Sequence, residues 1–255
     1  GASLSIRGSV ADPLPPVRSV ASQLASSFTN RVTPAKVGGL ALNVRWLVKE
    51  GVEASAAAAA VSVNAVGGLV VHVVLTVFVV IWAGGVGFGE FSLPSARTVL
   101  MGAVVIGAVV LVTWALPPLR RVVRHRVVPR ARQSLSAVAD VAAEPRRLVM
   151  LFGGSVVVSA CYVAALALSL RAMDAEVALS SVALVYLAGS ALATAAPTPG
   201  GLGATEAVFA AALTSVGVEQ SVAIPAVLLY RLVTFWLPIV PGWVAFTVLQ
   251  RTNRI

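Results

Sequence analysis

The sequence is poor in charge and in the residues that build metal sites and disulfides. Only 11% of its 255 residues are charged, against about a quarter in typical soluble domains. The single cysteine, Cys161, excludes an intramolecular disulfide, and the two histidines, His72 and His125, lie far apart. Nucleophile elbows, Walker loops, paired glycosidase acids and zinc motifs are also missing. We therefore expect no catalytic residue, no metal, no cofactor and no enzymatic activity.

The sequence is instead rich in apolar residues, at 58%, which indicates that the chain folds in lipid. A bilayer core needs about 20 apolar residues per helix. Four segments meet that length, at residues 54–82, 99–116, 148–170 and 222–249. The last contains Pro225, Pro238 and Pro241, so we expect kinks whose freed carbonyls find partners on neighbouring helices. The predicted fold class is an all-α, polytopic transmembrane bundle.

Two further regions are helical in pattern but broken by proline and glycine. The first comprises residues 17–30, a break at Thr33 and Pro34, and a short charged segment that ends at Glu50. The second comprises residues 177–196, a Pro-Thr-Pro-Gly-Gly break at 197–201, and a short segment at 202–216. Such breaks end helices, so each region is predicted to form two shorter helices around a tip.

The basic residues give an orientation. The loop at residues 117–147 contains eight arginines against two acids, and the tail adds Arg251 and Arg254. Under the positive-inside rule, this loop and the C-terminus are cytoplasmic. Next to two spans, the arginines are better placed to contact anionic lipid headgroups than nucleic acid. Residues 1–16 lack a hydrophobic core and are expected to be a pre-membrane segment or the edge of a fragment, with residues 17–255 forming one domain.

The two broken regions resemble each other in sequence. Residues 33–38 align with residues 198–203, and the Gly-Val-Glu turn at 51–55 aligns with 217–221. Repeat 1 then covers about 17–82 and repeat 2 about 177–249. If both breaks are tips of re-entrant hairpins, the count of crossings makes the two repeats inverted, as in many transporters whose broken helices meet at the substrate site. If both are ordinary interhelical loops, the charges fit equally well. The short, polar first region favours re-entrant hairpins.

Ionisable residues inside these segments are candidates for function. Glu206 and Arg231 either form a structural ion pair or act on a lipid phosphate, with Glu206 tuning Arg231 or carrying a proton. Lys36 and Arg45 either bind a headgroup or extend to the cytoplasmic interface. Asn30 either caps a helix or donates a hydrogen bond at the first tip. The glycine-rich tips leave helix N–H groups that favour anions such as phosphate.

These motifs resemble a known family. The run at 197–203 followed by Glu206, and residues 229–238 followed by Gly242, are similar to the lysylphosphatidylglycerol synthase transmembrane region family. Residues 30–45 and 144–145 fit the same pattern, so the resemblance covers about 17–249. Members include the flippase half of the multiple peptide resistance factor, which moves aminoacylated phosphatidylglycerol between leaflets. The resemblance implies a lipid-translocating domain of about eight helical segments. This sequence shows no span before residue 17 and no aminoacyl-transferase domain, so synthase activity is not carried over.

The sequence therefore predicts a cell-membrane protein that translocates an anionic, aminoacylated or polyprenyl-phosphate lipid. The alternative is a non-transporting anchor or regulatory partner of an envelope enzyme. The expected partners are membrane lipids and a fused or separate biosynthetic enzyme, with self-association left open and no nucleic acid. The candidate substrate-binding residues share a place at the breaks or in the last span: Asn30, Pro34, Lys36, Gly38, Gly39, Arg45, Pro199, Gly200, Gly201, Gly203, Glu206, Tyr230 and Arg231.

Overall fold

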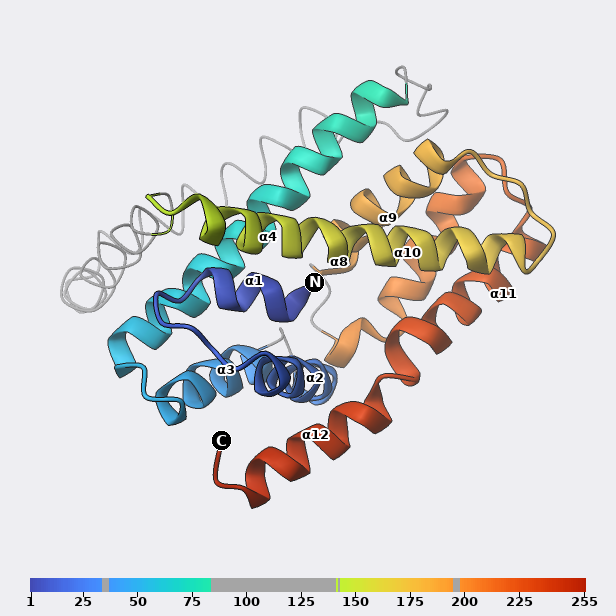
Figure 1. Ribbon diagram of the computed structural model, residues 1–255. Helices are drawn as coiled ribbons and strands as arrows, with labels where there is room; N and C mark the ends of the chain where they lie inside the picture. Colours follow the sequence, from blue (N-terminus) through green and yellow to red (C-terminus); the bar gives the residue numbers. More distant parts are fainter. Residues whose placement is uncertain (34–36, 84–140, 142, 195–197) are drawn as a thin grey trace, which may run out of the picture.

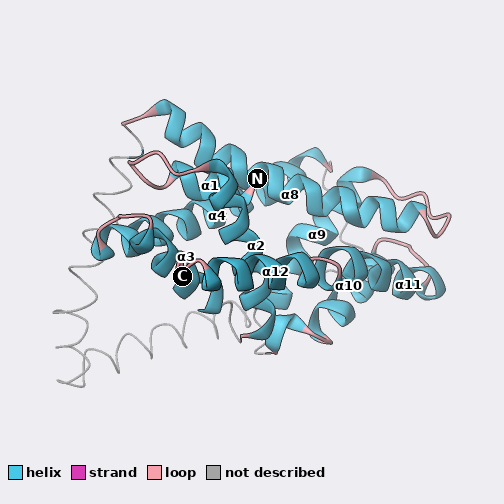
Figure 2. Cartoon of the chain, turned by 60° about the horizontal axis from the view of Figure 1, so that its bottom comes forward, coloured by secondary structure: helices cyan, strands magenta, loops and turns pink. Residues whose placement is uncertain are grey.

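The computed structural model describes residues 1–33, 37–83, 141, 143–194 and 198–255. Every regular element in these residues is a helix, as Figure 2 shows, which confirms the all-α fold class. The predicted span at 99–116, most of the arginine-rich loop, Pro34 and Lys36 lie outside the described residues. The helices, with short 3-10 and π turns between some of them, are α1 (Ala2–Gly8), α2 (Pro16–Val32), α3 (Val37–Lys49), α4 (Ala54–Trp82), α8 (Pro145–Arg171), α9 (Leu179–Thr194), α10 (Ala204–Ser215), α11 (Gln220–Arg231) and α12 (Ile239–Arg251).

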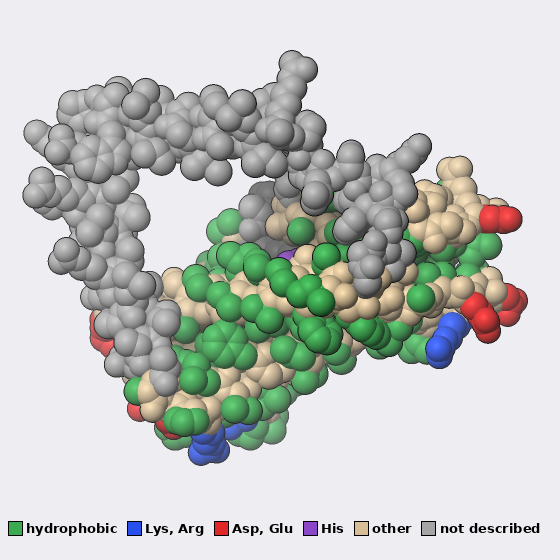
Figure 3. All heavy atoms as spheres, turned by 90° about the horizontal axis from the view of Figure 1, so that it is seen from above, with side chains coloured by type: hydrophobic (Ala, Val, Ile, Leu, Met, Phe, Trp, Pro, Cys, Tyr) green, Lys and Arg blue, Asp and Glu red, His purple; other side chains and the backbone are tan. Residues whose placement is uncertain are grey.

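In the part of the chain that the structure describes, three helical stretches are long and apolar enough to cross a membrane: α4, α8 and the continuous run Gln220–Arg251 that contains α11 and α12. They match three of the four predicted spans. Figure 3 shows one face of the molecule, where hydrophobic side chains cover the middle and charged side chains gather at the two ends. This distribution is the one expected of a protein whose middle lies in hydrocarbon.

The Gly-Val-Glu turns that suggested the repeat have the same local structure. Gly51 and Gly217 both adopt a left-handed backbone, with φ of 98° and 91°. The amide of the following valine donates to the carbonyl five residues before it, at 3.0 Å in the first turn and 3.1 Å in the second. The glutamate then precedes the next helix and accepts a hydrogen bond from the serine two positions later. In the first turn these hydrogen bonds lower the pKa of Glu53.

The two copies also share an order of elements. The first runs α2, break, α3, turn, α4, and the second runs α9, break, α10, turn, α11–α12. Their packing is reciprocal, because α2 of the first copy, seen nearly end-on in Figure 1, packs against α12, and α9 of the second packs against α4. At the second contact, His72 Nε2 on α4 lies 3.1 Å from the Leu187 carbonyl on α9.

Among the described residues, the buried side chains form two main clusters, and the long helices connect them in opposite directions. The first cluster combines α9, α10, part of α8 and the start of the Gln220–Arg251 run with the end of α4. The second cluster combines α1, α2, α3 and the start of α4 with the end of α12. Each copy's long helix therefore begins in its own cluster and ends in that of the other copy.

Residues 1–16 take part in the second cluster. Ile6 is fully buried, and Val10 and Leu14 are each 5% exposed. The short helix α1 packs on α8 at a close crossing, where a Cβ atom on Gly154 would lie 2.6 Å from the Ser5 amide nitrogen. This segment, which sequence composition places ahead of the membrane domain, thus contributes side chains to the folded core.

Candidate functional site

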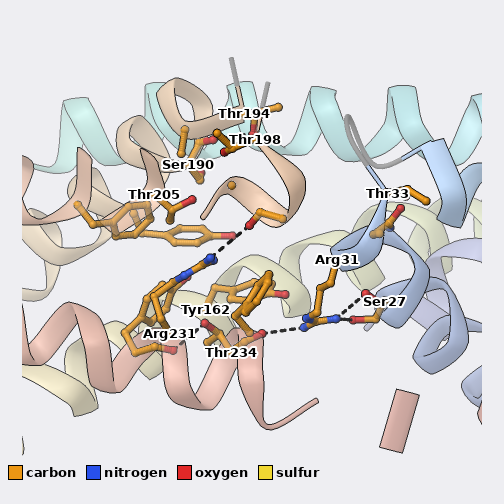
Figure 4. Close-up of a pocket in the computed structure, with 18 residues that line it drawn as sticks. Ser27, Arg31, Thr33, Tyr162, Ser190, Thr194, Thr198, Thr205, Arg231 and Thr234 are labelled. Carbon is orange, nitrogen blue, oxygen red and sulfur yellow. Dashed lines mark hydrogen bonds between the residues drawn. The ribbon is translucent and has the colours of Figure 1, made fainter. Parts of the chain in front are cut away.

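The two chain breaks converge on one cavity of about 420 Å³. Its wall combines the C-terminal end of α2, the second break, the first turn of α10, the face of α9, and the end of α11 with the turn that follows it. The cavity contains arginines, hydroxyl groups and aromatic rings in a protein whose exterior is apolar, as Figure 4 shows for the labelled side chains. Residues distant in sequence thus form one polar site.

The second break depends on glycine. Gly200, Gly201 and Gly203 have φ values of 61°, 68° and 79°, which non-glycine residues rarely adopt. A Cβ atom on Gly200 would also lie 2.5 Å from Phe235 Cε2, so an aromatic ring packs directly on this tip. The helix α10 that follows has no side-chain cap. The Ala207 amide donates to the carbonyl of Gly203, the residue just before α10, and forms the first backbone hydrogen bond of the helix. Its preceding amides are available to an anion.

Arg231 and Glu206, selected from sequence as intramembrane charges, form an ion pair. Arg231 Nε donates to Glu206 Oε1 at 2.7 Å, and Arg231 Nη2 donates to the Gly200 carbonyl at 3.2 Å. The guanidinium lies over the Phe235 ring, 4.2 Å from its centroid. The Arg231 side chain is only 9% exposed, whereas the Glu206 side chain is 23% exposed. Because Glu206 is in the first turn of α10, the helix dipole also stabilises its negative charge.

Arg31 is a second cavity arginine, and it is not among the site residues predicted from the sequence. It lies one position after Asn30 at the end of α2, and its Nη2 donates to the Thr234 carbonyl at 2.8 Å. Its Nη1 donates to the carbonyl and hydroxyl of Ser27. The signal that identifies it is its charge inside a segment predicted to enter the membrane. Among the described residues no acid pairs with Arg31.

The Thr234 carbonyl needs this partner because its helix is interrupted. Pro238, four residues later, has no amide hydrogen to donate. The chain forms a π turn at Leu232–Trp236, in which the Leu237 amide donates to the Leu232 carbonyl at 2.9 Å. The kink predicted from the proline pattern is confirmed, and the freed carbonyl is satisfied by a side chain from the other copy. Arg31 therefore joins the first hairpin to the broken helix of the second.

The first break differs from the second because its own side chains cap it. Asn30 Oδ1 accepts a hydrogen bond from the Gly39 amide at 2.9 Å, and Thr33 Oγ1 accepts one from the Gly38 amide at 3.0 Å. Both amides belong to the first turn of α3. Asn30 therefore caps the start of the following helix, α3, and not the end of its own helix, and the N-terminus of α3 is occupied by protein. At the second break, the first turn of α10 has no such cap, and Thr205 is its residue that lines the cavity.

Aromatic rings form the inner wall of the cavity. Tyr162 and Tyr186 are stacked with ring centroids 5.7 Å apart, and Phe209 and Tyr230 are stacked at 5.5 Å. Tyr186 meets Phe209 edge to face at 6.4 Å, so the four rings are continuous. Of these four residues, only Tyr230 was predicted to lie at the site. The four aromatic residues are on separate helices, and nothing in the sequence indicates that they are in contact.

The structure brings some predicted site residues together and separates others. Those at the cavity are Asn30, Gly200, Gly201, Tyr230 and Arg231, with Glu206 joined through its ion pair. Arg45 is exposed on α3, and it and the glycines Gly38, Gly39 and Gly203 do not line the cavity. Pro34, Lys36 and the side chain of Pro199 lie outside the described residues.

A second cavity, of about 720 Å³, lies between α10 and α11, with Glu206 on its wall. Most of its lining is apolar and includes three alanines of α10 together with Ile224 and Leu228. Glu206 therefore contacts the polar cavity through Arg231 and contributes its own side chain to the apolar one.

Comparison with known proteins gives one match along most of the chain. A family model described as "Lysylphosphatidylglycerol synthase TM region" matches residues 6–242. The UPF0104 membrane protein PH1989 of Pyrococcus horikoshii is 43% identical over 61 residues, which cover 24% of this chain and 18% of that protein. The matched segment thus spans less than a fifth of the relative's length. No solved structure matches the chain.

Proposed function

The chain belongs to the lysylphosphatidylglycerol synthase TM region family, and from this membership we propose that it translocates lipids by taking their headgroups into the cavity between the two breaks. The observation that carries the proposal is the pair of arginines, Arg31 and Arg231, in a cavity of about 420 Å³. Buried charges are costly in lipid and are retained where they bind or move something charged. The proposed action is binding and transport.

The charge of the cavity supports an anionic ligand. Arg31 and Arg231 contribute two positive charges and Glu206 one negative charge, so the group has a net charge of +1. The amide of Thr205, in the uncapped first turn of α10 and on the cavity wall, adds a further donor. A phosphate diester offers acceptor oxygens and a single negative charge, which complements both features. The apolar cavity on the other side of Glu206 offers a place for acyl chains while the headgroup is bound.

The proposed transport uses the reciprocal arrangement of the two copies. Their long helices run between two clusters in opposite directions, and Arg31 of one copy holds a carbonyl in the broken helix of the other. We propose that the two copies are inverted across the bilayer, that both breaks are re-entrant tips, and that the arginine-rich loop and C-terminus are cytoplasmic. Movement of one copy against the other would then expose the cavity to each leaflet in turn.

A liposome assay tests the proposal. Purified protein is reconstituted with a trace of fluorescent phosphatidylglycerol, and the fraction of label that moves between leaflets is followed by chemical quenching from outside. Arg231→Ala and Arg31→Ala are each expected to lower the rate at least tenfold, because each removes a phosphate-binding charge. Arg171→Ala, which removes an exposed arginine at the end of α8, is the matched control and should keep the wild-type rate.

Two outcomes would reject parts of the proposal. Equal rates for wild type and both cavity variants would reject the cavity as the site. No movement by the wild type above protein-free liposomes, together with a stable complex with an envelope enzyme, would favour the non-transporting anchor or regulatory partner.

A further inference from the structure

The hydroxyl group of Thr198 differs from four other hydroxyls on the cavity wall. Ser190 Oγ donates to the carbonyl three residues before it at 3.1 Å. Thr33, Thr194 and Thr234 each donate to the carbonyl four residues before them at 2.7 Å. Thr198 Oγ1 is buried and has no hydrogen-bond partner among the described residues. Its proton is therefore available to a ligand, whereas the protons of the other four are engaged.

The second break explains why this hydroxyl has no partner. Thr198 comes directly before the short 3-10 turn Pro199–Gly201, and a threonine in such a position often caps the turn with its side chain. Here the backbone makes the contact, because the Thr198 carbonyl accepts from the Gly201 amide at 3.0 Å. A buried hydroxyl without a partner costs free energy, so its place in the wall of a binding cavity indicates a contact that a ligand completes.

Thr198 lies on the side of the cavity opposite the arginines. Figure 4 shows Thr198 beside Ser190 and Thr194 above the cavity, with Arg31 and Arg231 below it. A cavity of about 420 Å³ is in the range that holds a whole small ligand, so a phosphate at the arginines leaves room beyond it. A bound phosphate diester also balances the net charge of +1, so the contact with Thr198 depends on hydrogen bonding.

We propose that Thr198 is a ligand-binding residue, whose hydroxyl donates a hydrogen bond to an oxygen of the headgroup beyond its phosphate. This inference rests on the proposed function and narrows its substrate class. The favoured ligands are phosphate diesters whose headgroup carries a further hydroxyl, ester or carbonyl oxygen. A soluble phosphate ester with the same groups has the same chemistry, so the test includes it as a separate arm.

The test compares two fluorescent lipids with the same acyl chains in liposomes containing the full chain. Phosphatidylglycerol carries hydroxyl groups beyond its phosphate, and phosphatidylmethanol carries only a methyl group there. Both are diesters with the same single negative charge, so they differ in hydrogen bonding alone. One hydrogen bond changes binding by a factor of about two to ten. We expect the wild type to move phosphatidylglycerol about fivefold faster than phosphatidylmethanol.

Variants test the hydroxyl directly. Thr198→Val keeps the shape of the side chain and removes the donor, so the ratio of the two rates should fall from about five to about one, whereas Thr198→Ser should keep most of it. Thr194→Val removes a hydroxyl from the same wall whose proton is already engaged, and should lower the ratio by no more than about twofold. Thr247→Val is the control for both rates, because this exposed threonine of α12 donates to its own helix at 2.9 Å, away from the cavity.

The unfolding free energy in mixed detergent micelles separates ligand binding from a structural role. In Thr198→Val a methyl group replaces a buried hydroxyl that has no partner in the ligand-free protein. This variant should therefore be at least as stable as the wild type. A variant that is destabilised and that slows both lipids equally would assign Thr198 to the structure of the break and overturn the proposal.

The failures are distinguishable. An unchanged ratio in Thr198→Val, or an equal loss in Thr194→Val, would overturn the role of Thr198 while lipid movement itself stands. If the wild type moves neither lipid, the proposed function fails, and the two lipids are then compared by equilibrium binding in micelles. Weaker binding of phosphatidylglycerol alone to Thr198→Val would still support the donor role, and unchanged binding would overturn it. Competition by glycerol 1-phosphate as effective as that by the lipid would overturn the lipid as the ligand.

Discussion

The ion pair between Glu206 and Arg231 makes a quantitative prediction about stability. The Arg231 side chain is only 9% exposed, so removing its partner leaves a charge with little access to water. Loss of one member of a buried pair costs about 3–5 kcal/mol. Here we expect about 2–3 kcal/mol for Glu206→Ala, because Arg231 keeps the Gly200 carbonyl and the Phe235 ring, and because Glu206 is 23% exposed.

Glu206→Gln separates charge from hydrogen bonding. Its amide oxygen can still accept from Arg231 Nε, which donates to Glu206 Oε1 at 2.7 Å, so only the charge is lost. A hydrogen bond between neutral and charged groups is weaker than one between two charges by about 1 kcal/mol, which is the expected cost. In Glu206→Ala, Arg231→Met both charges are absent, so the cost should be smaller than the sum of the single variants by about 2 kcal/mol.

The measurement is the free energy of unfolding in mixed detergent micelles, followed by helical circular dichroism. Glu176→Ala is the matched control, because this exposed carboxylate lies in the connection between α8 and α9, and its loss should change stability by no more than about 0.5 kcal/mol. Equal stabilities for Glu206→Ala and Glu206→Gln, with additive effects in the double variant, would refute the argument that the pair is a buried electrostatic contact.

Two further predictions compare matched glycines, measured as changes in the same unfolding free energy. Gly200→Ala should cost at least about 2 kcal/mol more than Gly203→Ala, because both have positive φ but only the first Cβ atom would meet a ring, 2.5 Å away. Equal losses would mean that backbone strain alone requires glycine there. Gly242→Ala should destabilise the protein by about 1–3 kcal/mol, because its Cβ atom would lie 2.8 Å from a backbone carbonyl oxygen of α2. Gly68→Ala should instead stabilise the protein by up to about 1 kcal/mol, because no atom lies within 4 Å of its Cβ position and alanine favours the helix. A neutral Gly242→Ala would show that the α2–α12 crossing tolerates a side chain.

Much of the helical architecture was predictable from local features. The span predicted at 54–82 coincides with α4, and the break at Thr33 follows the observed end of α2 at Val32. The alignment of 51–55 with 217–221 identified two turns with nearly equal φ at their glycines. These features could be predicted because proline, glycine and the length of an apolar run affect the backbone conformation locally, at their own positions in the sequence.

The site itself was only partly predictable. Glu206 and Arg231 were selected because a charge in an apolar segment is exceptional, and their ion pair follows from the structure. Arg31 is also a charge within a membrane-entering region, but it was not predicted. Its segment contains several other polar residues, so one more charge does not stand out there. Arg45, selected with equal reason, is exposed on α3 and does not line the cavity.

By itself the sequence determined that this chain folds as membrane helices, where those helices break, and that two halves share one order of elements. Only the tertiary structure decided which charges share a cavity and that Arg31 holds the Thr234 carbonyl across 203 residues of chain. The physical reason is range: helix ends and apolar spans are set by neighbours along the chain, whereas a cavity is set by which helices pack together.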